Sequence, residues 1–369
     1  MAARPGLLAA GADVTGWNMT NKYTTADVGS ERGPVPGRTA DGGAGAGNFR
    51  FSAPAVMMDG RGIDLSLALN YNSRVWHRAN SEITFDIDRD LIPGWNLGFG
   101  KIVMAGDTYF LMSGDGTRHP HIGTAHYSFP APMESIQTYE AYTTDGTFIH
   151  YYAEGYEPQF DNSGGKNLIT AWAVMPDGTR IEYGAQANYA IYPVRITDAH
   201  GNFINITYRN NEGPHIQTIT DTLGRVVQFH YDGSGLLTAI SVPGLGGSTR
   251  VAVRLQYQSL TLGNAGSNYG FSSGLTTKVR QGTIPMIKAI YYPGTNTGYW
   301  FGDGDSYSPY GMIRKVSERR GMTFDNAPLN QQGSIGAGVM SREIVYNYPQ
   351  SGTIRSPVAP TAPCRPTRR

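Results

Sequence analysis

The chain has 369 residues and a formal net charge of +1, with 30 basic against 29 acidic residues. This balance gives no electrostatic reason to expect a nucleic acid or an anionic membrane as partner. The single cysteine, Cys364, excludes an internal disulfide and a cysteine-based metal site, and no apolar stretch is long enough for a membrane-spanning helix. The 48 glycines, 22 prolines and 23 tyrosines instead predict many turns between short aromatic strands.

Residues 1–47 are rich in Gly, Ala, Pro and Thr without periodicity, and they predict a flexible lead-in. The glycines between Gly42 and Gly47 lack the preceding strand and the following helix of a dinucleotide site. The run from Gly6 to Gly11 is too short for the apolar core of a signal peptide. We therefore expect that export uses another route, or that the natural N-terminus differs.

From Asn48 onward the pattern becomes strand-like. Apolar residues occupy every second position from Ile63 to Tyr71, which predicts a long strand after a turn at Asp59-Gly60. The segment Pro93 to Gly98 then leads into a further strand.

Three Asp-Gly-Thr turns follow, at Asp115, Asp145 and Asp177, each between strand-like runs. Their spacings of 30 and 32 residues predict loosely repeated hairpins. Alternation continues beyond Pro243 as far as Tyr348.

A 23-residue repeat is the clearest pattern in the chain. Ile196-Thr197-Asp198 is matched 23 residues later by Ile219-Thr220-Asp221. Gly201, Ile206 and Tyr208 of the first copy are likewise matched by Gly224, Phe229 and Tyr231 of the second. An Asp followed three residues later by Gly supplies turn chemistry, since Asp bonds its own backbone and Gly accepts positive φ. In the second copy, Asp232-Gly233 lies between two strand-like runs and predicts a hairpin. The residues that we expect to define the repeat structurally are Asp198, Gly201, Tyr208, Asp221, Gly224, Arg225, Tyr231, Asp232, Gly235 and Leu237.

The run from Tyr231 to Ile240 resembles the Tyr-Asp (YD) repeat of bacterial RHS proteins. The order of Gly62 to Ser73 and Gly94 to Gly98 is similar to the segment that opens many RHS proteins, so the resemblance covers about Asn48 to Pro349. In the neighbouring copy Tyr208 is followed by Arg209 instead of Asp, which makes that copy degenerate.

This resemblance implies a sheet of hairpins wound into a hollow shell, which in the family encloses a C-terminal toxin domain or serves at the cell surface. The family's aspartyl self-cleavage centre carries an Asp-Pro-x-Gly motif. The chain has no Asp-Pro dipeptide, and we expect no toxin domain within it, so we carry over no catalytic residue.

Two patterns suggest chemistry of their own, and each has a simpler interpretation. Gly270-Phe271-Ser272-Ser273-Gly274 matches the nucleophile motif of hydrolases, but the flanking residues predict a loop instead of a buried strand and a helix. His119, His121 and His126 cluster after a predicted hairpin, and the first two could share a metal on one strand face. Pro120 weakens that geometry, so loop histidines are the favoured interpretation.

Acidic and aromatic runs also allow a functional and a simpler interpretation. Asp86, Asp88 and Asp90 begin like a calcium loop, and Asp303-Gly304-Asp305 echoes it, but both lack the Gly and Glu that an EF-hand requires. Aromatic residues could form a sugar-stacking platform, although cross-strand pairs that hold the sheet are favoured. The residues of the two candidate platforms are Tyr139, Tyr142, Tyr151 and Tyr152, and Tyr299, Trp300 and Phe301.

The sequence therefore predicts an all-β chain of repeated antiparallel hairpins in one long curled sheet, part of an RHS-type shell. Its expected parts are a lead-in (1–47), an N-terminal β region (48–160), YD-like repeats (161–350) and a disordered Pro/Arg tail (351–369). We expect a non-enzymatic scaffold without metal or cofactor, secreted or in the cell envelope. Its expected partners are further repeats of the same or an adjacent chain and an enclosed toxin domain. The alternatives are a carbohydrate-binding or adhesion module, and a hydrolase acting through Ser272.

Overall fold

The chain is nearly all-β. The computed structural model describes residues 40–41, 49–73, 75–79, 82–85, 91–105, 108–114, 119–131, 134–156, 168–187, 190–211, 213–262, 276–278, 283–346 and 366–368. Within these ranges the helical segments are two 3-10 turns, η2 (Arg209–Asn211) and η3 (Leu245–Gly247). The predicted fold class, antiparallel hairpins with little helix, is confirmed. Across the same ranges, no helix has the length and apolar character needed to cross a membrane.

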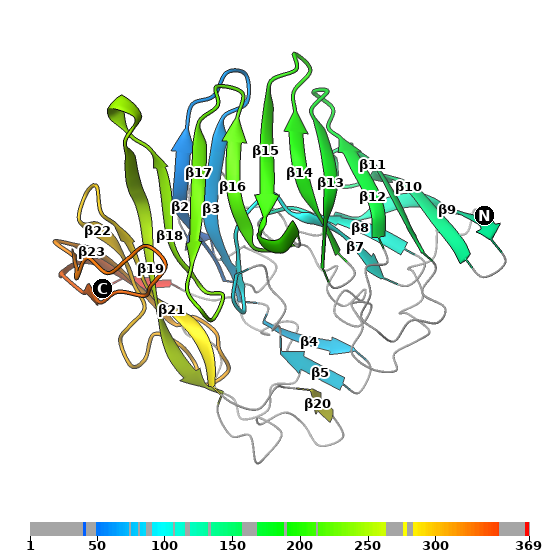
Figure 1. Cartoon of the computed structure of the whole chain (residues 1–369). Helices are drawn as coiled ribbons and strands as arrows, with labels where there is room; N and C mark the ends of the chain where they lie inside the picture. Colours follow the sequence, from blue (N-terminus) through cyan, green and yellow to red (C-terminus); the bar gives the residue numbers. More distant parts are fainter. Residues whose placement is uncertain are drawn as a thin grey trace. The chain divides into compact units, whose positions relative to one another are not determined.

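The chain divides into two compact units, of which the first holds residues 59–65 and 97–224 among its described parts. Strands β9 to β16 of this unit pair antiparallel with their sequence neighbours, and β7 pairs with β8 and with the start of β14 (Figure 1). The strands of the first unit are β7 (Lys101–Ala105), β8 (Thr108–Met112), β9 (His121–Ala131), β10 (Glu134–Thr143), β11 (His150–Tyr156), β12 (Leu168–Val174), β13 (Arg180–Ala187), β14 (Ala190–Thr197), β15 (Phe203–Tyr208) and β16 (Ile216–Asp221).

The second unit holds the described residues of 34–58, 66–96 and 225–369. Its main antiparallel ladder runs β17-β18-β19-β21-β22-β23-β26-β27, beside the smaller sheets β1-β2-β3-β6, β20-β5-β4 and β24-β25. Its strands are β1 (Ala40–Asp41), β2 (Arg50–Met58), β3 (Leu65–Asn72), β4 (Trp76–Ala79), β5 (Glu82–Phe85), β6 (Trp95–Asn96), β17 (Val226–Tyr231), β18 (Leu237–Pro243), β19 (Thr249–Thr261), β20 (Thr276–Lys278), β21 (Thr283–Tyr292), β22 (Thr297–Trp300), β23 (Lys315–Arg320), β24 (Thr323–Phe324), β25 (Ile335–Gly336), β26 (Val339–Tyr346) and β27 (Pro366–Arg368).

The period-2 pattern of the sequence decides which side chains form the core. In β15, Ile204, Ile206 and Tyr208 are buried, as their alternation predicts, because successive side chains of a strand point to opposite faces. In β3 the buried residues are every second one from Leu65 to Tyr71. Here the strand begins at Leu65, later than predicted, because Gly62 with φ of +84° forms the turn.

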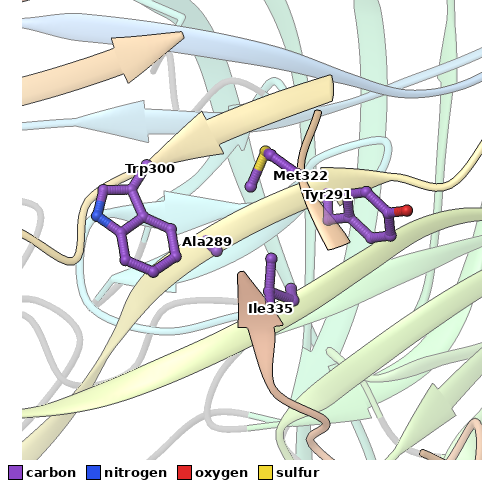
Figure 2. Close-up of a cluster of buried hydrophobic side chains, with 5 residues drawn as sticks. All are labelled: Ala289, Tyr291, Trp300, Met322 and Ile335. Atoms are coloured by element: carbon purple, nitrogen blue, oxygen red, sulfur yellow. The ribbon is translucent and has the colours of Figure 1, made fainter. Parts of the chain in front are cut away.

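A second layer covers part of the main ladder of the second unit. Figure 2 shows its centre, where Met322 and Ile335 pack against Ala289, Tyr291 and Trp300 from β21 and β22. Trp300 is only 8% exposed. The short strands β24 and β25 thus bury apolar area that the sheet face would otherwise expose.

The segment Asp325–Ser334, called the strap below, connects β24 to β25. Arg254 of β19 donates to the carbonyls of Ala327 (2.9 Å) and Pro328 (3.0 Å), and its guanidinium lies 4.4 Å from the ring centroid of Phe324. Gln332 donates to Asp232 over 2.7 Å. These bonds join residues more than 70 positions apart and hold the strap against β19 and the β17–β18 hairpin.

Several predictions lie outside the described residues. They concern most of the lead-in 1–47, the acidic run Asp86 to Asp90, the turn at Asp115, Ser272 and its motif, and most of the tail with Cys364. The predicted boundaries at 47, 160 and 350 remain predictions.

Candidate functional site

The repeat-defining aspartates close turns of one kind. Asp198 accepts the backbone N–H groups of His200 (2.8 Å) and Asn202 (2.9 Å), and its own carbonyl accepts the N–H of Gly201. Hydrogen bonds from the side chain and backbone of Asn202 hold the pKa of Asp198 below its ordinary value. Gly201 has φ of +83°, a conformation that favours glycine.

The turns at Asp221 and Asp232 repeat this arrangement. Asp221 Oδ1 accepts the N–H of Leu223, and Gly224 with φ of +73° donates to the Asp221 carbonyl. Asp232 Oδ1 accepts the N–H groups of Ser234 and Leu236. The Asp-x-x-Gly spacing therefore encodes the turn, as the repeat predicts. Arg225 directly follows the second turn and is half-buried.

The hairpin predicted at Asp232-Gly233 is confirmed, since β17 and β18 pair antiparallel on either side of it. The positive φ of its turn, +81°, falls on Gly235. Gly235 donates to the Asp232 carbonyl over 3.1 Å, which makes a longer turn of the same type as at Asp198. The glycine three residues after Asp determines the turn because Asp232 Oδ1 bonds Ser234 and Leu236 and orders the residues between.

The degenerate copy also differs in structure. After Tyr208 the chain forms η2, with Asn210 and Asn211 both at φ of +56°, and Arg209 donates from its backbone to His215. Without an aspartate at position 209, two asparagines take the left-handed conformation, which Asn tolerates better than most residues.

Buried tyrosines bond strands through their hydroxyl groups. Tyr208 donates to the carbonyl of Pro193, Tyr257 to that of Leu237 and Tyr151 to that of Tyr109, each over 2.8 Å. Leu237 is fully buried, and Tyr231, opposite it in the ladder, is half-buried. Tyr208 of the repeat is thus structural: its ring fills the core while its hydroxyl satisfies a backbone carbonyl.

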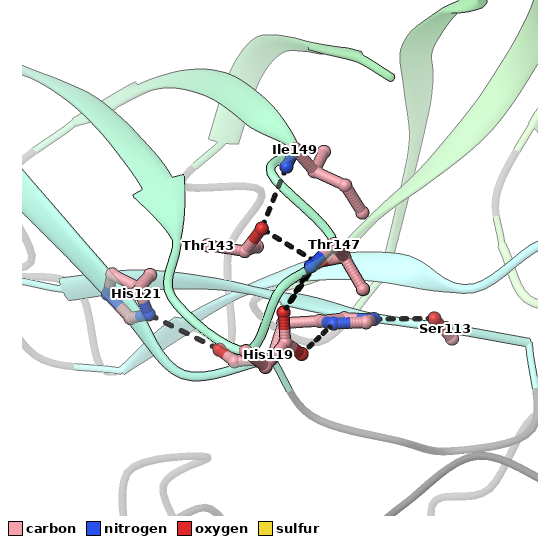
Figure 3. Close-up of polar contacts among 7 residues, drawn as sticks. Ser113, His119, His121, Thr143, Thr147 and Ile149 are labelled. Atoms are coloured by element: carbon pink, nitrogen blue, oxygen red, sulfur yellow. Dashed lines mark hydrogen bonds and ion pairs between the residues drawn. The ribbon is translucent and has the colours of Figure 1, made fainter. Parts of the chain in front are cut away.

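His119 is bonded through both ring nitrogens in a Ser–His–Asp chain of hydrogen bonds (Figure 3). Ser113 Oγ lies 2.7 Å from His119 Nε2, and Asp145 Oδ2 lies 2.7 Å from His119 Nδ1. His121 Nε2 instead contacts the hydroxyl of Tyr139 at 3.0 Å. No group of three His, Cys, Asp or Glu that could hold a metal occurs among the residues that the structure describes.

The sequence does not reveal the hydrogen bonds among Ser113, His119 and Asp145, because the three residues belong to three separate parts of the fold. Ser113 follows β8, His119 precedes β9, and Asp145 lies in the turn between β10 and β11. The His119 N–H donates to the Leu111 carbonyl, and the Thr144 N–H donates to the Pro120 carbonyl, which brings the three elements together. The Asp-Gly-Thr turn at Asp145 was predictable, but its contact with His119 was not.

Asp145 is held by its own turn. Its Oδ1 accepts the backbone N–H of Thr147 at 3.1 Å and also contacts the Thr147 hydroxyl, and Thr143 Oγ1 bonds both Thr147 and the N–H of Ile149 (Figure 3). Burial acts to raise the pKa of Asp145, but hydrogen bonds from Thr147 and His119 outweigh it and lower the pKa.

The segment Asp303-Gly304-Asp305, which resembles the start of a calcium loop, belongs to a salt-bridge cluster. Lys315 Nζ lies 2.7 Å from Asp305 and 3.5 Å from Asp303, and Glu343 lies 3.6 Å away. Arg319 lies 3.4 Å from Asp303. Burial acts to lower the pKa of Lys315, but these carboxylates outweigh it and raise the pKa. The ammonium therefore occupies the position between the carboxylates that a cation would need.

The first candidate aromatic platform divides between two faces of the sheet. Tyr139 and Tyr151 are buried, whereas Tyr142 is 54% exposed and Tyr152 is half-buried. This split follows from strand alternation within β10 and β11. The second candidate is wrong as a surface platform, because Trp300 and Phe301 are both buried.

Sequence reasoning missed a ladder of rings on the outer face of β10 to β12. Tyr142 stacks on His150 with centroids 4.3 Å apart, and Trp172 stacks on Tyr152 with centroids 5.7 Å apart. His150 also meets the edge of Trp172 at 4.9 Å. Each of these rings packs on a neighbour, which is the sheet-holding use of cross-strand aromatics.

Fold and turns together define a β-hairpin repeat protein. No family model matches the chain, and neither does any curated protein. Solved structures that contain similar chains include the TcdB2-TccC3-Cdc42 complex (10% identity, TM-score 0.35), the Tc holotoxin pore of Photorhabdus luminescens (11%, 0.35) and TcdB2-TccC3-TEV (12%, 0.33). They cover 82%, 85% and 87% of this chain. The chain spans about a sixth of the length of those chains, of which 16%, 16% and 17% are covered.

Proposed function

We propose that the chain is a β-repeat scaffold, a piece of an RHS-type shell wall that encloses or presents another polypeptide. The observation that carries this proposal is the recurrence of one self-contained turn: Asp198, Asp221 and Asp232 each bond the backbone within four residues. Such turns let a hairpin ladder extend without help from distant residues.

The side-chain arrangement supports a wall. Strands β15 and β17 bury alternate residues and leave the residues between them half-buried or exposed. The buried residues are Ile204, Ile206 and Tyr208 in β15, and Val227 and Phe229 in β17. Tyrosine hydroxyls then tie the strands to one another from within the core. We propose no reaction for the repeat turns themselves, because their aspartates are occupied by backbone N–H groups.

The proposed partners are further repeats, of this or an adjacent chain, and an enclosed polypeptide. A strand ladder exposes unpaired N–H and C=O groups at its edges unless another strand covers them. The proposed location, outside the cell or in its envelope, rests on the resemblance of Tyr231 to Ile240 to the YD repeat.

The test is co-expression of the chain with the polypeptide encoded directly downstream of it. A shell piece is expected to co-elute with that polypeptide and to protect it from protease, whereas the same polypeptide expressed alone is digested. Separate elution and full digestion of the co-expressed polypeptide would contradict the proposal.

The glycan alternative has one observation in its favour, the outer ladder with Tyr142 exposed at its end. Glu140 and Glu154 flank it and bond His150 and the Tyr152 hydroxyl. A glycan array distinguishes the two functions: binding that is lost in Trp172→Ala, but kept in Tyr292→Phe, would favour an adhesion module. If the array gives no signal above background, the adhesion alternative is contradicted and the scaffold is the one proposed function left.

A further inference from the structure

Two histidines in the described part of the chain bond a serine, and only one of them also bonds a carboxylate. His230 Nε2 lies 2.8 Å from Ser241 Oγ, and His119 Nε2 lies 2.7 Å from Ser113 Oγ. The structure pairs the other nitrogen of His119 with Asp145 at 2.7 Å. It shows no such carboxylate partner for His230 among the described residues, and burial together with Arg254 lowers the pKa of His230.

The Asp145 carboxylate determines which ring nitrogen of His119 carries the hydrogen. An ionised carboxylate only accepts hydrogen bonds, so His119 Nδ1 carries the hydrogen that it donates to Asp145. In a neutral imidazole the other nitrogen, Nε2, is then an acceptor and faces the Ser113 hydroxyl. This is the proton arrangement that lets a histidine take the hydrogen of a serine.

The group is fixed in place before any substrate binds. The side chain of His119 is 8% exposed and that of Asp145 is 25% exposed. Asp145 is also bonded by Thr147, so it holds the ring orientation of His119 at no cost in side-chain entropy during a reaction.

The backbone beside Ser113 carries glycines. A Cβ on Gly114 would lie 2.1 Å from the Gly98 carbonyl oxygen, and a Cβ on Gly100 would lie 2.0 Å from the Met112 carbonyl oxygen. Both close approaches require glycine, so Gly100 and Gly114 place no side chain beside the half-buried Ser113.

We propose that Ser113, His119 and Asp145 form an acyl-transfer site that hydrolyses carboxylic esters. Ser113 Oγ bonds the carbonyl carbon of the ester while His119 Nε2 takes the hydroxyl proton. The bond from the acyl carbon to the alcohol oxygen then breaks, and the proton passes from His119 to the departing alcohol. Water repeats the two steps with His119 as base, and Ser113 and a carboxylic acid are released.

Ser113 and His119 are the catalytic residues of this proposal, and Asp145 is a positioning residue. The activity goes beyond the scaffold role, which needs no chemistry, and it departs from the sequence-based expectation of a non-enzymatic chain. The proposed nucleophile is also different from Ser272, the serine that the sequence motif suggested.

The test treats the full chain with a fluorophosphonate probe and with p-nitrophenyl acetate. We expect stoichiometric labelling, mapped by peptide mass spectrometry to Ser113, and ester hydrolysis that Ser113→Ala abolishes. Ser241→Ala, from the serine–histidine pair without a carboxylate, is expected to leave both unchanged. Asp145→Asn is expected to lower kcat by about 10² to 10⁴ while KM stays the same.

A second pair of variants keeps the test independent of the probe. Ser113→Cys is expected to react with iodoacetamide at least about tenfold faster than the double variant Ser113→Cys/His119→Ala, because His119 promotes the thiolate. Circular dichroism and the thermal midpoint confirm that each variant is folded. Absence of labelling at Ser113 together with equal thiol reactivity in the two cysteine variants overturns the proposal, and so does hydrolysis that persists in Ser113→Ala.

Discussion

Replacing Arg254 with alanine is expected to release the strap and to lower the free energy of unfolding by about 2–3 kcal/mol. Arg254 is 6% exposed and donates to the carbonyls of Ala327 and Pro328. Hydrogen bonds from a charged donor contribute about 1.5–3 kcal/mol each, and the contact with the Phe324 ring adds about 0.5–1 kcal/mol.

The expected loss lies below that sum for two reasons. Removing a buried guanidinium also removes the cost of taking its charge out of water. The carbonyls it leaves belong to a strap with an exposed Pro328, where water can replace the lost donors.

The assay is urea unfolding combined with hydrogen exchange of residues 325–334. Arg250→Ala is the control, because Arg250 lies on the same strand but is exposed. It is expected to change stability by less than about 0.5 kcal/mol. If Arg254→Ala costs no more than Arg250→Ala and exchange in the strap does not rise, the strap is not held by Arg254.

Three further predictions concern turns and tyrosines. Gly235→Ala is expected to cost about 1–2 kcal/mol in urea unfolding because its φ is +81°, while Gly233→Ala, outside the left-handed region, is expected to cost less than about 0.5 kcal/mol; equal costs would contradict the turn assignment. Tyr257→Phe is expected to cost about 1–2 kcal/mol because the buried Leu237 carbonyl loses a donor, with exposed Tyr142→Phe near zero as control. Burial raises the pKa of Tyr257 well above 10, so above pH 10 the unfolded chain loses protons that the folded chain keeps. Stability is therefore complete below pH 10 and falls as the pH rises further, and the fall in midpoint denaturant concentration should be less steep in Tyr257→Phe; identical slopes would refute this.

Local patterns in the sequence predict the hairpins well. The alternation of Ile204, Ile206 and Tyr208 gives the buried face of β15, and the spacing of Asp198 and Gly201 gives its turn, because both depend on residues within one strand or one reversal.

Contacts set by register over long distances could not be predicted. Trp172 meets His150 only because β11 and β12 pair in the observed register, with Tyr152 opposite Trp172. The contact between His119 and Asp145 requires two turns and a strand hairpin to converge. The sequence around either residue carries no sign of the other, so the histidine cluster, interpreted as loop histidines, gave no indication of the bonds to Ser113 and Asp145.

The Asp-x-x-Gly turns bear on how such a chain can grow in evolution. Asp198 and Asp221 stand 23 residues apart at the same edge of the first unit, where Thr222 Oγ1 contacts both the N–H and the carbonyl of Phe203. One copy therefore contains two antiparallel strands, so the chain ends each copy at the edge where the copy began. A tandem duplication of a single copy leaves the strand direction and the buried face of the following strands unchanged. Gene lengthening or shortening in whole copies leaves the flanking hairpins intact, whereas an insertion of one strand would reverse everything downstream.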